Sequence, residues 1–238
     1  MLKRRQATIF DYIDGPAKPK TGPLNVLELY AGSRSIGKMA EKYGHNVFSV
    51  DWKPFDGIDL VADISKMTMD DVPWTPDVVW ASPDCTTYSV AAVSKHRKGG
   101  VDPTSEYATQ CDMTNERMIR MLKEWLTINP YMVFFIENPR GMMRKMPFMS
   151  KLPANTQRHT VWYCQYGENR AKPTDIWTND KKWTPRPECW NGNKNCHHQP
   201  APRGARTGTQ GIKGTYDKSK IPTQLCVDVV KALSETFI

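Results

Sequence analysis

Two residues that could take part in catalysis lie at or just after the ends of apolar runs that are typical of buried strands. The run DVVWASP (77–83) leads to Cys85, and the run YMVFFIENP (131–139) carries Glu137 near its end. Uninterrupted apolar runs are typical of parallel strands covered on both faces, and the carboxyl ends of such strands line ligand sites. A thiolate at Cys85, with a lowered pKa, can act as a nucleophile. Glu137 can stabilise charge that develops on a substrate.

An earlier turn has the features of a nucleotide-binding loop. It separates the apolar run LNVLELY (24–30) from a helix-like stretch that ends at Gly44. Backbone amides and the helix N-terminus can hold the ligand there. The next apolar run ends in Asp51 and Trp52. Asp51 can accept hydrogen bonds from ribose hydroxyls, and Trp52 can cover the adenine ring. In the alternative interpretation, Asp51 caps a loop and Trp52 belongs to the core. The turn consists of Tyr30, Ala31, Gly32, Ser33, Arg34 and Ser35, and Asp63 and Ile64 can contact the adenine edge.

The order of strand, turn, helix and strand predicts an α/β fold with a doubly wound, Rossmann-like sheet. Residues 115–126 have apolar side chains at helical spacing and predict a crossover helix. We expect four segments: an N-terminal arm (1–23), a catalytic domain (24–178), a small basic recognition segment (179–220) and a C-terminal helix that packs back on the catalytic domain (221–238).

Composition narrows the class of protein. The 33 Lys and Arg exceed the 25 Asp and Glu, which gives a net charge of +8 and favours a polyanionic partner such as nucleic acid. No secretion signal and no apolar stretch of about 18 residues occurs, so we expect a cytoplasmic protein without a membrane segment. The six cysteines should therefore be free, catalytic or bound to metal.

The segment ASPDCTTYS (81–89) resembles the catalytic motif of the DNA cytosine-C5 methyltransferases, usually Pro-Pro-Cys-Gln-x-Phe-Ser. ENP (137–139) is similar to the Glu-Asn-Val motif of that family, and the order of motifs matches over residues 24–233. The resemblance implies a compact, phage-type or orphan member that transfers a methyl group from S-adenosylmethionine to cytosine C5 in DNA. We expect a monomer that takes part in restriction-modification in a bacterial or phage-infected cell.

The resemblance also implies roles for individual residues. Cys85 adds to C6 of cytosine, and Glu137 contacts N3 and the exocyclic amine. The basic motif of the family corresponds to residues 166–172, so that Arg170 and Lys172 contact the base or phosphates; Gln157 and Arg158 are the rival assignment. Asn138 and Pro139 fix the strand end, and Pro83 and Ser219 lie at the cofactor.

The sequence departs from the family at four places. Asp84 replaces the second proline, and a carboxylate beside Cys85 raises the pKa of the thiol unless it is paired. Thr86 replaces a glutamine, and Arg34 and Ser35 stand where glycines are usual. The C-terminal motif contains Lys218 and Lys220, which either face solvent, touch DNA or indicate a modified S-adenosylmethionine.

A basic stretch, SKHRKGGVDPTS (94–105), predicts a mobile loop that closes over the target. The target base must leave the duplex to reach Cys85, and basic side chains can then meet phosphates. The alternative is a solvated run of charges. The basic residues are Lys95, His96, Arg97 and Lys98.

A possible zinc site lies in the basic recognition segment, which lacks apolar residues for a core of its own. Its candidate ligands are Cys189, Cys196, His197 and His198, and Cys164 can complete the set. A structural Zn²⁺ would supply the stability that the segment lacks. Trp183, Trp190 and the RGAR stretch (203–206) would then form a compact module that faces DNA.

Three functions stay open. The first is a DNA cytosine-C5 methyltransferase. The second keeps the fold and cofactor but acts on RNA or a free pyrimidine nucleotide, because the recognition segment is short. The third is an inactive DNA-binding homologue, which Asp84 and Arg34 suggest; the presence of both Cys85 and Glu137 argues against it.

Overall fold

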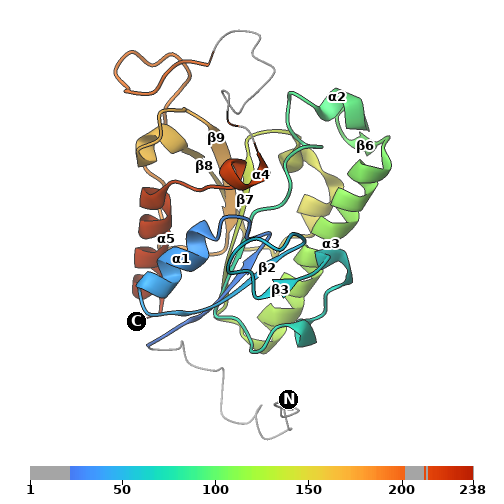
Figure 1. Ribbon diagram of the computed structural model, residues 1–238, viewed down its shortest axis with the longest axis vertical. Coiled ribbons are helices and arrows are strands. Elements are labelled where there is room, and N and C mark those ends of the chain that lie inside the picture. The colour runs from blue at the N-terminus through green and yellow to red at the C-terminus, as the bar shows by residue number, and fades with distance from the viewer. Residues whose placement is uncertain (1–21, 202–211, 213, 238) are drawn as a thin grey trace, which may run out of the picture.

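A seven-stranded sheet forms the centre of the computed structural model, which describes residues 22–201, 212 and 214–237 (Figure 1). Helices cover both faces of this sheet, and a separate two-stranded hairpin lies next to the long helix that spans residues 106–128. The sheet strands are β1 (Asn25–Leu29), β2 (Asn46–Asp51), β3 (Leu60–Val61), β4 (Val78–Ala81), β7 (Val133–Pro139), β8 (Gln157–Trp162) and β9 (Pro173–Thr178); the hairpin is β5 (Arg97–Lys98) and β6 (Asp102–Pro103). The helices are α1 (Ser35–Lys42), α2 (Val93–His96), α3 (Glu106–Ile128), α4 (Thr215–Lys218) and α5 (Thr223–Thr236).

The sheet has the order β3-β2-β1-β4-β7-β9-β8, which confirms the predicted doubly wound fold. The chain moves outwards from β1 through β2 to β3 and then returns to the other side of β1 as β4. The five strands from β3 to β7 are parallel, and β9 and β8 add an antiparallel edge that the sequence did not predict. The topological switch point therefore lies between β1 and β4, where such sheets bind ligands.

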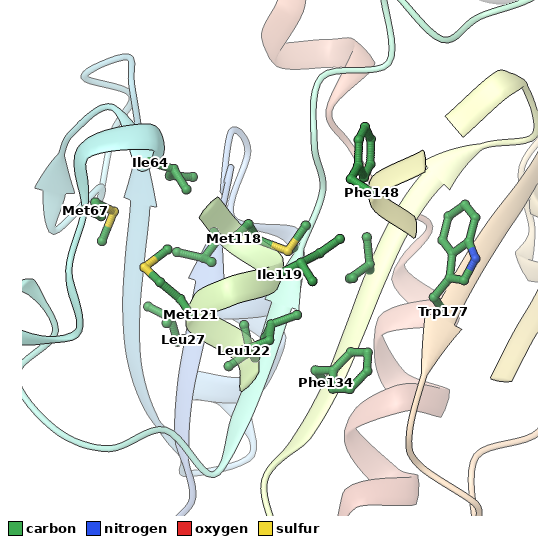
Figure 2. Packing of buried hydrophobic residues seen from close by; sticks show 14 of the residues in the cluster. Leu27, Ile64, Met67, Met118, Ile119, Met121, Leu122, Phe134, Phe148 and Trp177 are labelled. Atoms are coloured by element: carbon green, nitrogen blue, oxygen red, sulfur yellow. The ribbon is translucent and has the colours of Figure 1, made fainter. Parts of the chain in front are cut away.

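Helix α3 covers one face of the sheet and begins well before the predicted stretch 115–126. The Oγ atom of Ser105 accepts a hydrogen bond from the Ala108 amide, at 3.2 Å, and so caps the helix at its N-terminus. Figure 2 shows the apolar face of α3 directed at the sheet strands. The buried side chains on that face include Met118, Ile119, Met121, Leu122 and Trp125.

Helices α1 and α5 lie together on the opposite face (Figure 1). Trp183 joins their core: it is 2% exposed, and its ring packs edge-on against Phe135 with the centroids 5.8 Å apart. The prediction that Trp183 faces DNA is therefore wrong. Burial of its large apolar indole in the core is more favourable than exposure of that surface to water. Trp190 is 60% exposed, as a surface role requires.

Some expectations concern residues outside the described ranges. Residues 1–21, which make up most of the proposed N-terminal arm, and the RGAR stretch (203–206) lie there, and the division into four segments stays a prediction. Within the described residues, no helix is long and apolar enough to cross a membrane.

Candidate active site at the carboxyl edge of the sheet

The candidate residues gather at the carboxyl ends of three adjacent strands. Leu29 of β1 pairs with Ala81 of β4, and Ala81 pairs with Ile136 of β7. The cofactor turn follows Leu29, Cys85 follows Ala81, and Glu137 follows Ile136. The sheet register thus brings the three predicted parts of the site to one edge.

The cofactor turn is held from the side by Asp51. One carboxylate oxygen of Asp51 accepts a hydrogen bond from the Gly32 amide at 2.9 Å, and the other accepts one from the Lys53 amide at 2.9 Å. A carboxylate has about four acceptor positions, so Asp51 keeps capacity for ligand hydroxyls. Trp52 beside it is 68% exposed, which excludes the alternative that it belongs to the core.

Arg34 does not offer its side chain to a ligand. Its backbone is left-handed, with φ of 56°, which explains why glycine is usual at this position of the family motif. The guanidinium is buried, donates to Ser49 Oγ at 2.9 Å and pairs with Glu41. Of the turn residue Arg34, only the backbone is left for cofactor binding.

A buried carboxyl group supports the turn from below. Glu28 in β1 accepts hydrogen bonds from the Ile36 amide and from Ser49 Oγ, both at 3.1 Å. Burial raises the pKa of Glu28 to about 7, against the opposing effect of these hydrogen bonds and of Arg34. The sequence did not single out Glu28, although a carboxyl in an otherwise apolar strand is a signal of this kind.

Ser219 lies against the turn, as the predicted cofactor role requires. Its Oγ accepts a hydrogen bond from the Ser33 amide at 3.0 Å, and Ser35 Oγ accepts one from the Ile221 amide at 3.1 Å. A Cβ atom at Gly32 would stand 2.6 Å from Ser219 Oγ, so the contact requires glycine there. The site is therefore closed by the segment that leads into α5.

Two other predicted cofactor residues, Asp63 and Ile64, also have structural roles. Asp63 caps a short helical turn by accepting a hydrogen bond from the Ser65 amide at 2.9 Å, and Ile64 is buried in the core. Lys218 and Lys220 are exposed, and Lys220 pairs with Asp217 at 2.8 Å. Solvent-facing lysines thus fit better than lysines directed at the cofactor.

A hydrogen bond ties the two catalytic motifs together. Asn138, fully buried, donates from Nδ2 to the carbonyl of Pro83 at 2.8 Å. The chain after Pro83 then forms a turn in which the Cys85 carbonyl accepts from the Tyr88 and Ser89 amides. Pro83 and Asn138 consequently fix where Cys85 lies relative to β7.

The Cys85 thiol is half-buried, and its pKa is raised rather than lowered. Burial raises the pKa of Cys85 to about 11; Asp84 and Glu137 add to this effect and Lys172 opposes it. The activated thiolate therefore stays a prediction, since burial and the two carboxylates favour the neutral thiol in the protein without its substrate. The positive charge of Lys172 is the influence among these that favours the thiolate.

Asp84 lies next to Cys85 in the chain and accepts two hydrogen bonds. It accepts from Tyr107 Oη at 2.7 Å and from the Thr86 amide at 2.6 Å.

We expect Asp84→Asn to lower the pKa of Cys85 and to speed its alkylation by iodoacetamide at pH 8, because a fall of one pKa unit raises the thiolate fraction about tenfold. Mass spectrometry of the Cys85 peptide measures the rate.

The control for this prediction is Asp102→Asn, because Asp102 is exposed and is not among the charges that shift the Cys85 pKa. The control should leave the alkylation rate unchanged. An Asp84→Asn protein whose Cys85 reacts no faster than that of the unmodified chain would show that the carboxylate does not restrain the thiol.

Tyr163 connects Glu137 to Lys172, and the sequence did not reveal it. The Tyr163 hydroxyl donates to Glu137 Oε1 at 2.9 Å, and Lys172 Nζ lies 4.2 Å from the centroid of its ring. Burial and the nearby Glu137 charge raise the pKa of Tyr163 well above its usual value, so the hydroxyl stays a donor. Glu137, Tyr163 and Lys172 form a connected group beside Cys85.

Arg170 and Arg158 are not part of that group. Arg170 donates from Nε to Glu168 at 2.8 Å and is held in this ion pair. Arg158 pairs with Trp177 in the sheet, whereas Ile176 lies opposite Glu137. Successive strand residues point to opposite faces, so Arg158 and Glu137 project from different sides. Lys172 is the member of the predicted basic motif that lies near Cys85.

The basic stretch 94–105 forms α2 and the β5–β6 hairpin, and Arg97 within it does not face phosphates. Its side chain is 0% exposed and forms an ion pair with Asp112 of α3 at 2.7 Å. It also donates to the Thr87 carbonyl at 3.0 Å. The predicted role of Arg97 is wrong, because these partners occupy the guanidinium; Lys95 and Lys98 are exposed.

We expect Arg97→Met to lower the free energy of unfolding by about 3 kcal/mol, because it removes a buried guanidinium and leaves Asp112 with the Tyr88 hydroxyl as its remaining partner among these hydrogen bonds. Urea denaturation measures the change. The matched control Lys98→Met changes an exposed side chain of the same hairpin and should stay within about 0.5 kcal/mol. Equal effects from the two variants would contradict the structural role of Arg97.

Three of the four predicted metal ligands come together, with one exchange. The Sγ atoms of Cys164, Cys189 and Cys196 and a ring nitrogen of His198 all lie within 4.8 Å of one another. His197 is exposed, and its Nε2 contacts the Glu168 carbonyl at 2.9 Å. Cys164 therefore takes the place that the sequence assigned to His197.

The strand order and the helices on both faces define a doubly wound, Rossmann-like fold. The methyltransferase EhMeth of Entamoeba histolytica has a similar structure, with a TM-score of 0.50 and 14% identity over 66% of this chain and 53% of that chain. A DNMT2 variant of Spodoptera frugiperda matches with a TM-score of 0.47 and 18% identity, over 74% of this chain and 57% of that chain. The chain spans about half the length of these solved structures.

A sequence relative is known from a virus. The chain is 27% identical over 167 residues to a probable DNA (cytosine-5)-methyltransferase of Frog virus 3, and the match covers 68% of this chain and 74% of the relative. No protein-family model matches the sequence. The relative supports the resemblance to the DNA cytosine-C5 methyltransferases that the motifs around Cys85 and Glu137 indicate.

Proposed function

We propose that the protein transfers a methyl group from S-adenosylmethionine to C5 of cytosine in DNA through a covalent adduct with Cys85. The observation that carries the proposal is the convergence of Cys85, Glu137 and Lys172 beside the cofactor turn at one edge of the sheet. The name of the viral relative supports both the reaction and the substrate.

C5 of cytosine is a weak nucleophile and must be activated before it can accept a methyl group. Addition of the Cys85 thiolate to C6 makes C5 electron-rich enough to take the methyl group from the sulfonium, which leaves as the neutral thioether S-adenosylhomocysteine. Water then takes the C5 proton, the C5–C6 double bond reforms and the thiolate is released. Glu137 holds N3 and the exocyclic amine while charge develops on the ring. Lys172 favours the thiolate of Cys85 and so opposes, in part, the effects of burial and of Asp84.

The cofactor side of the site suits S-adenosylmethionine. Asp51 keeps acceptor positions for ribose hydroxyls, and the exposed Trp52 can cover an adenine ring. S-adenosylmethionine supplies the methyl group as an electrophilic sulfonium. The turn around Gly32, with Ser33 and Ser219 hydrogen-bonded across it, orients the donor. A donor with a charged group in place of the methyl is the alternative, and the exposed positions of Lys218 and Lys220 do not favour it.

DNA is the proposed substrate because the chain carries a net charge of +8 and a target base must be taken out of its stack to reach the half-buried Cys85. The recognition segment is short, so we propose that sequence readout is limited to a few base pairs.

The test is a transfer assay with radiolabelled S-adenosylmethionine and three separate acceptors: duplex DNA, RNA of the same sequence and cytidine nucleotides. Nucleoside analysis of the product should give 5-methyldeoxycytidine from DNA. Label found only in RNA or in nucleotides would overturn the substrate, and label at another atom of cytosine would overturn the reaction. Binding of DNA without transfer under all conditions would favour the inactive homologue.

A further inference from the structure

A compact cluster of sulfur and nitrogen atoms lies where the 189–198 segment meets the residues that follow β8. We infer that Cys164, Cys189, Cys196 and His198 bind one Zn²⁺ ion. Cys164, Cys189 and His198 are buried and Cys196 is half-buried. The inference concerns a metal centre and does not depend on the proposed methyl transfer.

The spacing of the ligand atoms suits a tetrahedral ion. With Zn–S bonds of about 2.3 Å, the edge of a tetrahedron of sulfur atoms measures about 3.8 Å. The four ligand atoms all lie within 4.8 Å of one another, and Cys189 Sγ lies 3.8 Å from His198 Nδ1. Small shifts bring every ligand to bonding distance, and the three thiols release their protons to water as they bind.

Polar side chains surround the sulfur atoms in the way that metal-bound thiolates require. Asn193 Nδ2 donates to Cys189 Sγ at 3.4 Å. Gln165 Nε2 points at the other two sulfur atoms, at 3.9 Å from each. Such N–H donors stabilise the negative charge of thiolates and orient them. Neutral thiols would gain little from three contacts of this kind.

The His198 ring lacks a better partner in the described part of the chain. It is 4% exposed, and its Nε2 atom makes no hydrogen bond there. Its Nδ1 atom faces the Cys189 thiol, which is a weak hydrogen-bonding group. A buried imidazole in this position is costly unless a metal ion uses one of its nitrogens.

The chemistry of the ligand set favours zinc. Thiolates together with an imidazole in a tetrahedral arrangement are typical of structural zinc sites, which have no open position. A disulfide between two of the cysteines would leave the third thiol and His198 without a function. The apolar contacts around the cluster are few, formed by Trp162, Ala171 and the cysteines themselves, so a metal adds stability that packing does not supply.

The position of the cluster gives the metal a consequence for the site. Cys164 directly follows Tyr163, whose hydroxyl holds Glu137. The three other ligands lie in the 189–198 segment. The ion therefore joins this segment to the part of the chain that contains Tyr163 and Cys164. The exposed Trp190 directly follows the ligand Cys189, so the bound ion would restrain its position.

The experiment begins with the full chain purified under reducing conditions without added metal. Elemental analysis should find about one zinc per chain. Metal-free protein titrated with Co²⁺ should develop the charge-transfer and visible bands of tetrahedral thiolate coordination, and Zn²⁺ should displace them. These measurements use the unmodified chain, so they do not depend on whether a variant folds.

Variants identify the ligands. His198→Ala and Cys164→Ser should lower the affinity for Zn²⁺ by at least about 100-fold, more than is typical when only a hydrogen-bond partner of a ligand is lost. His197→Ala and Cys226→Ser are matched controls outside the cluster and should retain the metal. Loss of zinc in His197→Ala with retention in His198→Ala would overturn the ligand assignment.

Other results would overturn the inference itself. These are a chain without zinc that gives no tetrahedral Co²⁺ spectrum, a disulfide among the three cysteines in the reduced preparation, or stoichiometric iron or copper in place of zinc. Metal content is measured without DNA or S-adenosylmethionine. A failure here therefore leaves the methyl-transfer assay intact, and a failed methyl-transfer assay leaves the zinc result intact.

Discussion

Cys85→Ser is expected to reduce methyl transfer to DNA by at least about 10⁴-fold, as is usual when a covalent nucleophile is removed. A serine hydroxyl has a much higher pKa than a thiol and is a far weaker nucleophile toward C6 of cytosine. The turn that holds this residue is formed by backbone hydrogen bonds from Tyr88 and Ser89 to its carbonyl, so the substitution should leave the fold intact. Initial rates with labelled S-adenosylmethionine measure the loss.

A covalent complex tests the same role directly. DNA that contains 5-fluorocytosine should become attached to the unmodified chain, because the fluorine at C5 cannot leave as a proton does. Cys85→Ser should give no adduct, whereas Cys226→Ser, which changes a buried thiol of α5, should give the normal yield. Undiminished transfer by Cys85→Ser would refute the covalent mechanism.

Glu137→Gln is expected to lower the rate of methyl transfer by about 10²–10⁴-fold, the range typical of a positioned acid or base. Glutamine has the same shape, and its carbonyl oxygen can still accept the hydrogen bond from Tyr163, so the site should keep its geometry. What is lost is the ability to hold a proton between the side chain and N3 of the base. Steady-state kinetics and circular dichroism together separate this effect from misfolding.

The matched control is Glu116→Gln, which changes a carboxylate of α3 that pairs with Lys151 and whose side chain is 40% exposed. We expect no measurable change in rate from it. If Glu137→Gln retained full activity, Glu137 would be a structural partner of Tyr163 and the proposed contact with the cytosine ring would be wrong.

Much of the fold could be predicted because β1, β4 and β7 are apolar along nearly their whole lengths. A run such as Val78–Ala81 can only be a strand covered on both faces, and its end must lie at the edge where Cys85 follows. The antiparallel β9–β8 edge was missed, because Gln157 and Arg158 give the start of β8 a polar character that resembles a loop. The local sequence pattern indicates which segments form buried strands, but it does not indicate which strands lie next to one another in the sheet.

The parts of the site that sequence could not predict depend on contacts between distant residues. Arg97 resembles a solvated loop residue until α3 brings Asp112 beside it. Tyr163 gains its role only because β9 places the end of β8 near Glu137. Cys164 likewise joins the histidine and cysteines of a later segment through that hairpin. In each case tertiary structure sets the partner, and no local pattern singles out Tyr163.

The bond between the Ser33 amide and Ser219 Oγ joins residues that are 186 positions apart. During synthesis, the turn around Gly32 leaves the ribosome long before residue 219 exists, and folding then waits for a contact of high sequence separation. A nascent chain can assemble most of the sheet and still lack the piece that closes the donor site. We therefore expect a chain cut before residue 219 to bind the proposed methyl donor more weakly than the full chain, because the turn then lacks this hydrogen bond.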